Sequence, residues 1–170
     1  MRLLRTAAAS IALASAAIAS PAFANMEEIA AAVEADYESY LEPLFVHFHK
    51  TPELSYLENK TAARMAQELR DAGLEVTENV GGTGVVGMVR NGEGPLIMLR
   101  ADMDGLPVEE KSGLDYASVA MQVGEDGKEY PVMHACGHDG HITSMVGTAR
   151  YLMDNRDAWS GTLLFIVQPA

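Results

Sequence analysis

The chain has 170 residues, of which 48% are hydrophobic and 21% are charged, a balance typical of globular proteins rather than disordered or membrane-spanning ones. Its formal net charge of −12 argues against nucleic acid and anionic membrane surfaces as partners, because both attract basic patches. The one cysteine, Cys136, excludes an internal disulfide, so we expect it to be buried, paired between chains or bound to a ligand.

Residues 1–24 have the features of an export signal. Arg2 and Arg5 precede an apolar, alanine-rich stretch, and a small-x-small cleavage pattern ends at Ala24. A short membrane anchor is the alternative, but about 13 apolar residues are too few for a bilayer that needs roughly 20. We therefore expect cleavage after Ala24, a periplasmic or secreted location without membrane contact, and one domain formed by residues 25–170.

Helical spacing of apolar residues marks the segment that starts at Met26. Pro43 indicates a break or the first turn of a helix, so we predict one helix and a short second one. A third helix is predicted next, because Ser55 and Glu58 form a capping-box pattern. Gly73 stands where a left-handed C-terminal cap is expected for that helix.

Short runs rich in β-branched residues predict three strands separated by glycine turns. These runs are residues 74–80, 85–90 and 96–101. The Asn91-Gly92 pair between the second and third runs favours a tight hairpin.

The last third of the chain predicts a crossover unit. Apolar spacing indicates a helix over residues 142–154, and the apolar run 162–167 is typical of a strand buried on both faces. With strand 96–101 these segments predict an α/β fold with flanking helices and a mainly parallel sheet. Such sheets place functional groups past the carboxyl ends of their strands, where Asp102-Met103-Asp104 and residues 168–170 lie.

The segment from His134 to His141 gathers three imidazoles, a thiol and a carboxylate. Cysteine sulfur and histidine nitrogen both bind zinc and similar ions, so the Cys136-x-His138 spacing predicts two metal ligands on a loop. Asp139 precedes the helical stripe, and a helix cap is its favoured role over ligation. For His141, ligation and an outer or surface role remain equally open.

The remaining candidate site residues are two aspartates and a histidine that is distant from them in sequence. Alternation along a strand puts Asp102 and Asp104 on the same side, where their repulsion favours a nearby cation. Such carboxylates can also hold a ligating imidazole in one tautomer, although an ordinary acidic turn remains an alternative. His49 lies near a predicted helix end, where a partly buried, dipole-stabilised histidine is the expected role.

Three runs in order resemble one family, the amidohydrolase branch of the aminoacylase/carboxypeptidase metallopeptidases. The branch includes hippurate hydrolases, auxin-conjugate hydrolases and N-acyl amino acid deacylases. The runs are His49-Lys50-Thr51-Pro52-Glu53-Leu54-Ser55 with Glu58 and Thr61, Leu99-Arg100-Ala101-Asp102-Met103-Asp104-Gly105-Leu106-Pro107, and Met133-His134-Ala135-Cys136-Gly137-His138-Asp139-Gly140-His141.

This resemblance implies a catalytic domain that binds two divalent ions, with zinc, manganese, cobalt and nickel all suited to mixed ligands. It also implies a smaller domain, used for substrate closure and often for a homodimer. Cys136 and His138 match metal ligands of the branch, and Asp104 matches the acid that orients the site. Asp102 stands where other branches carry a ligating histidine, so its role stays open.

The implied reaction is hydrolysis of the amide bond of an N-acyl amino acid or related small amide by metal-activated water. In the family, two glutamates directly follow the Gln168-Pro169-Ala170 segment, one as general base and one as ligand. We therefore interpret this sequence as an N-terminal fragment and expect it to be inactive by itself. A noncatalytic metal-binding remnant and a dipeptidase are the alternatives.

Overall fold

The structure, a computed structural model, describes residues 26–170. The predicted export signal lies outside these residues. None of the helices in the described part of the chain is both long and apolar enough to span a membrane.

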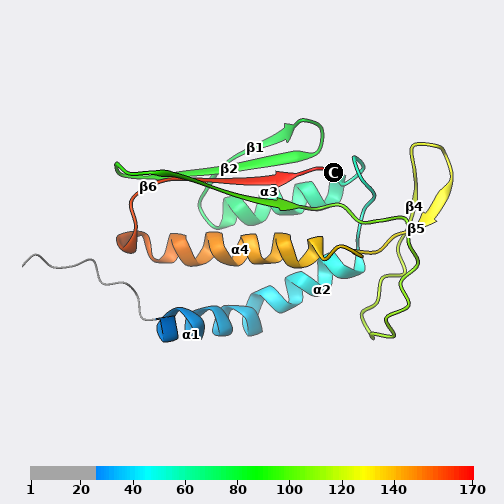
Figure 1. Cartoon of the computed structure of the whole chain (residues 1–170), viewed down its shortest axis with the longest axis horizontal. Helices are drawn as coiled ribbons and strands as arrows, with labels where there is room; N and C mark the ends of the chain where they lie inside the picture. Colours follow the sequence, from blue (N-terminus) through cyan, green and yellow to red (C-terminus); the bar gives the residue numbers. More distant parts are fainter. Residues whose placement is uncertain (1–25) are drawn as a thin grey trace, which may run out of the picture.

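A four-stranded sheet forms the centre of the fold, with the order β1-β2-β6-β3 (Figure 1). The strands are β1 (Glu75–Val80), β2 (Gly84–Asn91), β3 (Leu96–Asp102) and β6 (Gly161–Gln168). The β1/β2 and β2/β6 ladders are antiparallel, and only β3 and β6 pair in parallel. The prediction of a mainly parallel sheet is therefore wrong, because β2 pairs antiparallel with both of its neighbours, β1 and β6.

The hairpin predicted at Asn91-Gly92 is also wrong, since β6 lies between β2 and β3. Asn91 instead pairs with Gly161, and its side-chain amide donates to the carbonyl of Trp159 at 2.6 Å. The tight hairpin of this sheet joins β1 to β2, and the turn includes Gly81 and Gly82, both at positive φ.

The predicted crossover is confirmed. Helix α4 (His138–Asp154) connects β3 to β6, which lie side by side in parallel. Asp102 at the end of β3 is in register with Gln168 at the end of β6. The carboxyl ends of both strands therefore meet at one edge of the sheet.

Helices α3 (Asn59–Asp71) and α4 cover one face of the sheet, and the N-terminal helices lie on the far side of α4 (Figure 1). These are α1 (Met26–Asp36), the π-helical turn η1 (Tyr37–Leu41) and α2 (Glu42–Lys50). Pro43 lies in the first turn of α2, as predicted, because its missing N–H is not needed there.

The π-helical turn η1 docks the N-terminal helices onto α4. Arg150 donates three hydrogen bonds to the carboxylate of Asp36, at 3.2, 2.9 and 2.7 Å, and its guanidinium lies 4.1 Å from the centre of the Tyr40 ring. Gly147 lies opposite Leu41, where a Cβ would come within 2.7 Å of the leucine side chain. The absence of a side chain at Gly147 therefore permits the close approach of η1.

The predictions made for the two ends of α3 have different outcomes. The capping box is wrong: Glu53 accepts from the backbone N–H and hydroxyl of Thr61, whereas Ser55 donates to Asp104. At the other end the glycine cap is confirmed, because Gly73 has a φ of 92° and donates to Arg70. The N–H of the next residue bonds back to the carbonyl of Leu69, completing the motif.

The core lies between the sheet and helices α3 and α4. Leu163, Phe165 and Val167 of β6 are buried, while the alternating residues Leu164 and Ile166 are only half-buried. The prediction that this strand is buried on both faces is therefore wrong, because helices of the described residues cover only one face. The remaining elements are a small hairpin, β4 (Met121–Val123) with β5 (Glu129–Pro131), and the short helix η2 (Arg156–Ala158).

Candidate metal centre

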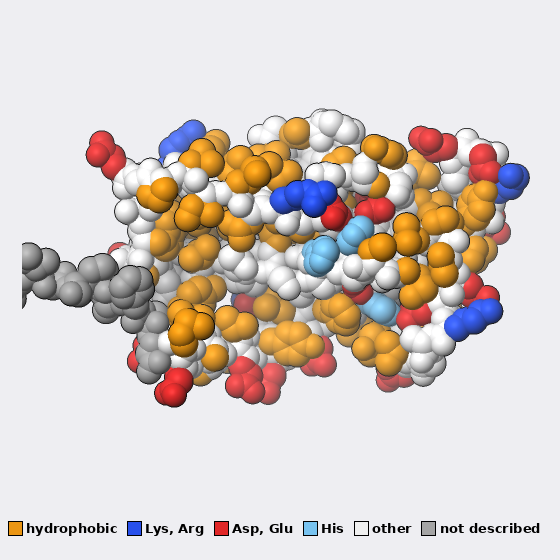
Figure 2. All heavy atoms as spheres, in the orientation of Figure 1, with side chains coloured by type: hydrophobic (Ala, Val, Ile, Leu, Met, Phe, Trp, Pro, Cys, Tyr) orange, Lys and Arg blue, Asp and Glu red, His pale blue; other side chains and the backbone are white. Residues whose placement is uncertain are grey.

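The polar side chains singled out in the sequence gather where β3 ends and α4 begins. In Figure 2, histidine side chains reach the surface there beside acidic and basic side chains. Asp102 is the last residue of β3, and His138 is the first residue of α4. The crossover topology brings these two ends together, which places the candidate centre at the carboxyl edge of the parallel pair.

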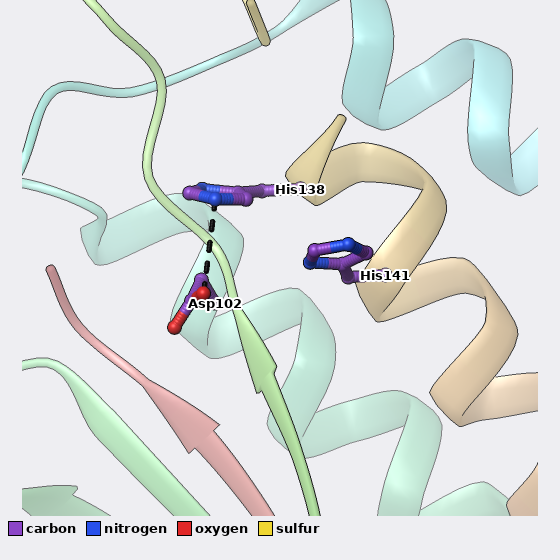
Figure 3. Close-up of side chains that lie close together, drawn as sticks. All are labelled: Asp102, His138 and His141. Atoms are coloured by element: carbon purple, nitrogen blue, oxygen red, sulfur yellow. Dashed lines mark ion pairs between the residues drawn. The ribbon is translucent and has the colours of Figure 1, made fainter. Parts of the chain in front are cut away.

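Asp102, His138 and His141 form a potential donor group (Figure 3). Each offers one ligand atom, and these atoms lie within 4.8 Å of one another. Two of the three come from the first turn of α4, where a spacing of three residues puts side chains on one face. A carboxylate oxygen and two imidazole nitrogens suit zinc, manganese, cobalt or nickel.

Asp104 holds the ring of His138. His138 Nδ1 lies 2.9 Å from Asp104 Oδ1 and 3.0 Å from the Asp104 carbonyl oxygen, so Nδ1 carries the proton and donates. The other carboxylate oxygen of Asp104 accepts from the hydroxyl of Ser55 at 2.9 Å. This arrangement leaves His138 Nε2 as the free lone pair, 3.7 Å from Asp102 Oδ2.

The carboxylate of Asp102 has fewer directed hydrogen bonds than that of Asp104. Arg100 Nη2 lies 2.6 Å from Asp102 Oδ1, yet this buried oxygen has no aligned hydrogen-bond donor among the described residues. Arg100 also donates from Nε to the side-chain oxygen of Gln168 at 2.6 Å. The other carboxylate oxygen, Oδ2, lies on the side of His138 Nε2 and is free of Arg100, so it is the oxygen that fits a divalent cation shared with the imidazoles.

The predicted ligands differ in their outcome. The structure brings His138 into the donor group and Asp104 against it, but Cys136 is exposed and is not a member of the group. Its role as a ligand stays a prediction. Asp102 and His141, whose roles the sequence left open, are both members. The helical spacing of His138 and His141 would have indicated this, had the helix been predicted to begin at residue 138.

Asp139 does not cap α4, so that expectation is wrong. The N-cap is Gly137, at a φ of 75°, with no side-chain hydrogen bond. Asp139 lies inside the first turn and accepts from Nδ1 of His49 at 2.7 Å. His49 lies in the last turn of α2, near a helix end as predicted, and also donates from Nε2 to Glu110 at 3.0 Å.

The charges around this bridge favour an imidazolium. Burial opposes protonation of His49, but its hydrogen bonds to Asp139 and Glu110, and their charges, raise its pKa above the ordinary value. Burial likewise opposes ionisation of Glu110, but hydrogen bonds from Ser112, Ser118 and His49 lower its pKa.

His134 is the other buried histidine beside this centre. Its Nδ1 lies 3.2 Å from the carbonyl oxygen of Asp104, and its Nε2 has no hydrogen-bond partner among the described residues. Burial lowers the pKa of His134, so the neutral ring is favoured.

Known proteins resemble this chain in sequence. A profile of peptidase family M20/M25/M40 matches residues 98–170. Thermostable carboxypeptidase 2 of Saccharolobus solfataricus is 47% identical over 124 residues, which are 72% of this chain and 29% of that protein. Hippurate hydrolase of Campylobacter jejuni is 42% identical over 136 residues, which are 79% of this chain and 33% of that protein.

A solved structure agrees with these relatives. The YXEP protein of Bacillus subtilis, described as a dinuclear metal-binding peptidase from the M20 family, superposes with a TM-score of 0.69 and 34% identity. The match covers 81% of this chain and 36% of that one. The chain thus spans about a third of the length of the relatives it matches.

The fold resembles that of a dinuclear metal-binding peptidase, and the donor group offers side chains that could hold a metal ion. The chain belongs to the M20 peptidase family, in its amidohydrolase branch.

Proposed function

We propose that this chain supplies part of the metal centre of a hydrolase that cleaves the amide bond of N-acyl amino acids. The observation that carries the proposal is the convergence of Asp102, His138 and His141 beside Asp104 at the carboxyl ends of β3 and β6. The names of relatives support the substrate class, since they include a hippurate hydrolase and an N-acetyl-L-cysteine deacetylase.

The residues of this chain have separate tasks in that reaction. Asp104 fixes the tautomer of His138, so that Nε2 presents its lone pair to a cation. Asp102 supplies negative charge, which Arg100 balances in the absence of other cations. A divalent cation held by Asp102, His138 and His141 would supply Lewis acidity for the attack of water on the scissile carbonyl. By analogy with the B. subtilis structure, we propose two such ions in the intact enzyme.

A peptidase acting on small peptides is the second candidate, favoured by the similarity to a carboxypeptidase. Both reactions use the same bond chemistry, so only substrate preference separates them. A parallel assay of N-acyl amino acids and dipeptides with a full-length enzyme decides between them. Dipeptide cleavage with no cleavage of N-acyl amino acids would replace the deacylase by a dipeptidase.

Metal binding tests the centre directly. We expect cobalt titration, followed by visible absorption, to show that His138→Ala lowers affinity more than roughly tenfold, because it removes a ligating nitrogen. Cys136→Ala should do the same if the predicted thiolate ligand is correct, and the matched control His47→Ala should not. Unchanged affinity in the His138 variant would remove the proposed centre, whereas unchanged affinity in the Cys136 variant alone would remove only that ligand.

We also propose that residues 1–170 alone do not turn over substrate. The donor group of the described residues holds three side chains, fewer than a two-metal centre uses, and the chain spans about a third of its relatives. The purified chain would be assayed with zinc, manganese or cobalt on N-acetyl and N-benzoyl amino acids. Metal-dependent turnover that disappears in His138→Ala would contradict this proposal.

Export is proposed from the sequence of residues 1–24. Mass spectrometry of protein made in its host should find Asn25 at the mature N-terminus. Intact Met1 on protein recovered from the cytoplasm would contradict export.

A further inference from the structure

His49 joins three parts of the chain that are distant in sequence. It comes from the last turn of α2, and its two ring nitrogens donate to Asp139 of α4 and to Glu110 of the loop that follows β3. These partners lie 90 and 61 residues away along the chain. The imidazole is therefore a bridge between elements rather than a local helix contact.

The bridge is well shielded from water. The side chains of Glu110 and Asp139 are 1% and 4% exposed, and that of His49 is 11% exposed. The rings of Phe45 and Tyr116 lie against His49, with centroid distances of 5.6 and 5.2 Å. Charges in such surroundings interact more strongly than at the surface, and a carboxylate left without its cation is strongly destabilised.

Glu110 is itself fixed from the loop side. One of its oxygens accepts from the hydroxyl of Ser112, and the other accepts from the backbone N–H of Ser118 at 2.6 Å. The carboxylate is thus already oriented toward His49 by its own loop. This leaves the imidazole little freedom, so it presents Nδ1 to Asp139 in a defined direction.

The first turn of α4 needs such an anchor. Its N-cap, Gly137, has no side chain with which to bond the N–H groups of the turn, and Asp139 Oδ1 accepts one of them, from Gly140 at 2.9 Å. Asp139 sits within this turn, next to His138 and two residues before His141. A tether on Asp139 therefore restrains both histidines of the donor group.

We infer that His49 is a positioning residue that fixes the first turn of α4, and with it His138 and His141, through its bridge between Glu110 and Asp139. The inference rests on the proposed metal function, but the effect on α4 is measurable without any metal. It assigns a task to a histidine that contributes no ligand atom to the donor group.

The test compares His49→Gln with His47→Gln in the purified chain. His47 lies one position from Phe48 on the same helix turn, and its ring contacts Phe48 rather than a carboxylate, so it is the matched control. Two quantities are measured: the affinity and absorption spectrum of bound cobalt, and hydrogen exchange of the amides of residues 138–142 without metal.

We expect His49→Gln to weaken cobalt binding about tenfold and alter its absorption bands, in the range found when a group orienting a ligand is removed. Exchange of the His141 amide, which donates to the carbonyl of Gly137, should rise about tenfold, while amides of β6 stay protected. His47→Gln should change neither quantity more than about twofold, since surface changes have small effects. A loss of thermal stability alone does not count in favour, because any core histidine would produce it.

Glu110→Gln is the second variant, because His49→Gln could fail to fold. Glu110 makes no hydrogen bond or ion pair to α4 among the described residues, so its effect must pass through His49. It should shift cobalt binding and α4 exchange in the same direction. Unchanged cobalt affinity and spectrum in a folded variant of either residue would overturn the inference. If the unsubstituted chain binds no cobalt, the proposed function fails, and the exchange measurement alone decides the role of His49.

Discussion

The sheet core and the edge beyond β3 bury side chains of opposite character. Between the sheet and helices α3 and α4, the buried residues are apolar, with Phe165 and Met65 fully enclosed. At the end of the sheet where β3 stops and α4 begins, the buried residues that gather from several segments include carboxylates and imidazoles. They are His49, Glu53, Glu58, Asp104, His134 and Asp139.

The two regions differ in what each residue needs. A core residue needs volume and contact, which many neighbours supply together. A buried polar residue needs particular donors or acceptors, and nearly all of those at the edge have them. Of the three buried side-chain atoms without a hydrogen-bond partner among the described residues, Asp102 Oδ1 and His134 Nε2 lie at the candidate centre. In this chain, buried polar atoms that lack a hydrogen-bond partner therefore indicate the candidate site better than burial does.

The largest effect should come from the core. Phe165→Ala should lower the free energy of unfolding by about 3–5 kcal/mol, because it removes a fully buried ring and leaves a cavity. Urea denaturation of the purified chain measures this change. The control Leu96→Ala, on the neighbouring strand with 65% of the residue exposed, should change stability by less than about 0.5 kcal/mol. Equal losses in both variants would mean that the sheet face is not as described.

A smaller effect is expected at the polar edge. Glu58 is fully buried, and its oxygens accept from the hydroxyl of Thr83 and the backbone N–H of Tyr56. Glu58→Gln places an amide group among donors, so one of them loses its acceptor at a cost of about 1–3 kcal/mol. The exposed Glu125→Gln is the control in the same urea experiment. A neutral result for Glu58→Gln would contradict the requirement of the edge for matched donors and acceptors.

The smallest effect is a dependence of stability on pH at the His49 bridge. The pKa of His49 is raised in the folded chain, so its stabilising contribution is complete below about 6.5 and is lost as pH rises through the higher folded pKa. The lowered pKa of Glu110 acts in the other direction, with its contribution lost as pH falls below the ordinary value near 4.5. The bridge should therefore stabilise most between these two values.

Thermal unfolding of the chain and of His49→Gln at pH 5.5 and 8.5 checks this prediction. The difference between the two proteins should be larger at pH 5.5. Comparing them at each pH removes the contributions of His47 and His134, whose pKa values burial lowers and which act in the opposite sense. A larger difference at pH 8.5 would contradict the imidazolium bridge.

Local patterns predicted the elements but not the order of the sheet. The helices around Pro43, the cap at Gly73 and the crossover through α4 all follow from spacing within a few turns of chain. The position of β6 between β2 and β3 does not, since Asn91-Gly92 has the composition of a hairpin turn and only distant pairing decides against one.

The candidate site, like the fold, was predicted only where its residues belong to local patterns. The family resemblance implied that Asp104 orients the site, and the structure places its carboxylate against His138. The bridge from His49 to Glu110 was not predicted, because Glu110 belongs to no motif and lies 61 residues from its partner. The open choice at His141 depended on where α4 begins, which periodicity fixes only to within a few residues.

The π-helical turn Tyr37–Leu41 has a consequence for how this chain tolerates insertion and deletion. A π-helical turn accommodates one residue more than a regular helix. Deletion of that extra residue would leave a continuous α-helix from α1 into α2. Each residue of an α-helix turns the chain by about 100°, and one deleted residue would therefore rotate Asp36 away from Arg150. An otherwise mild change in chain length would undock α1 while every helix stayed helical, so the length of this segment is constrained more tightly than its composition.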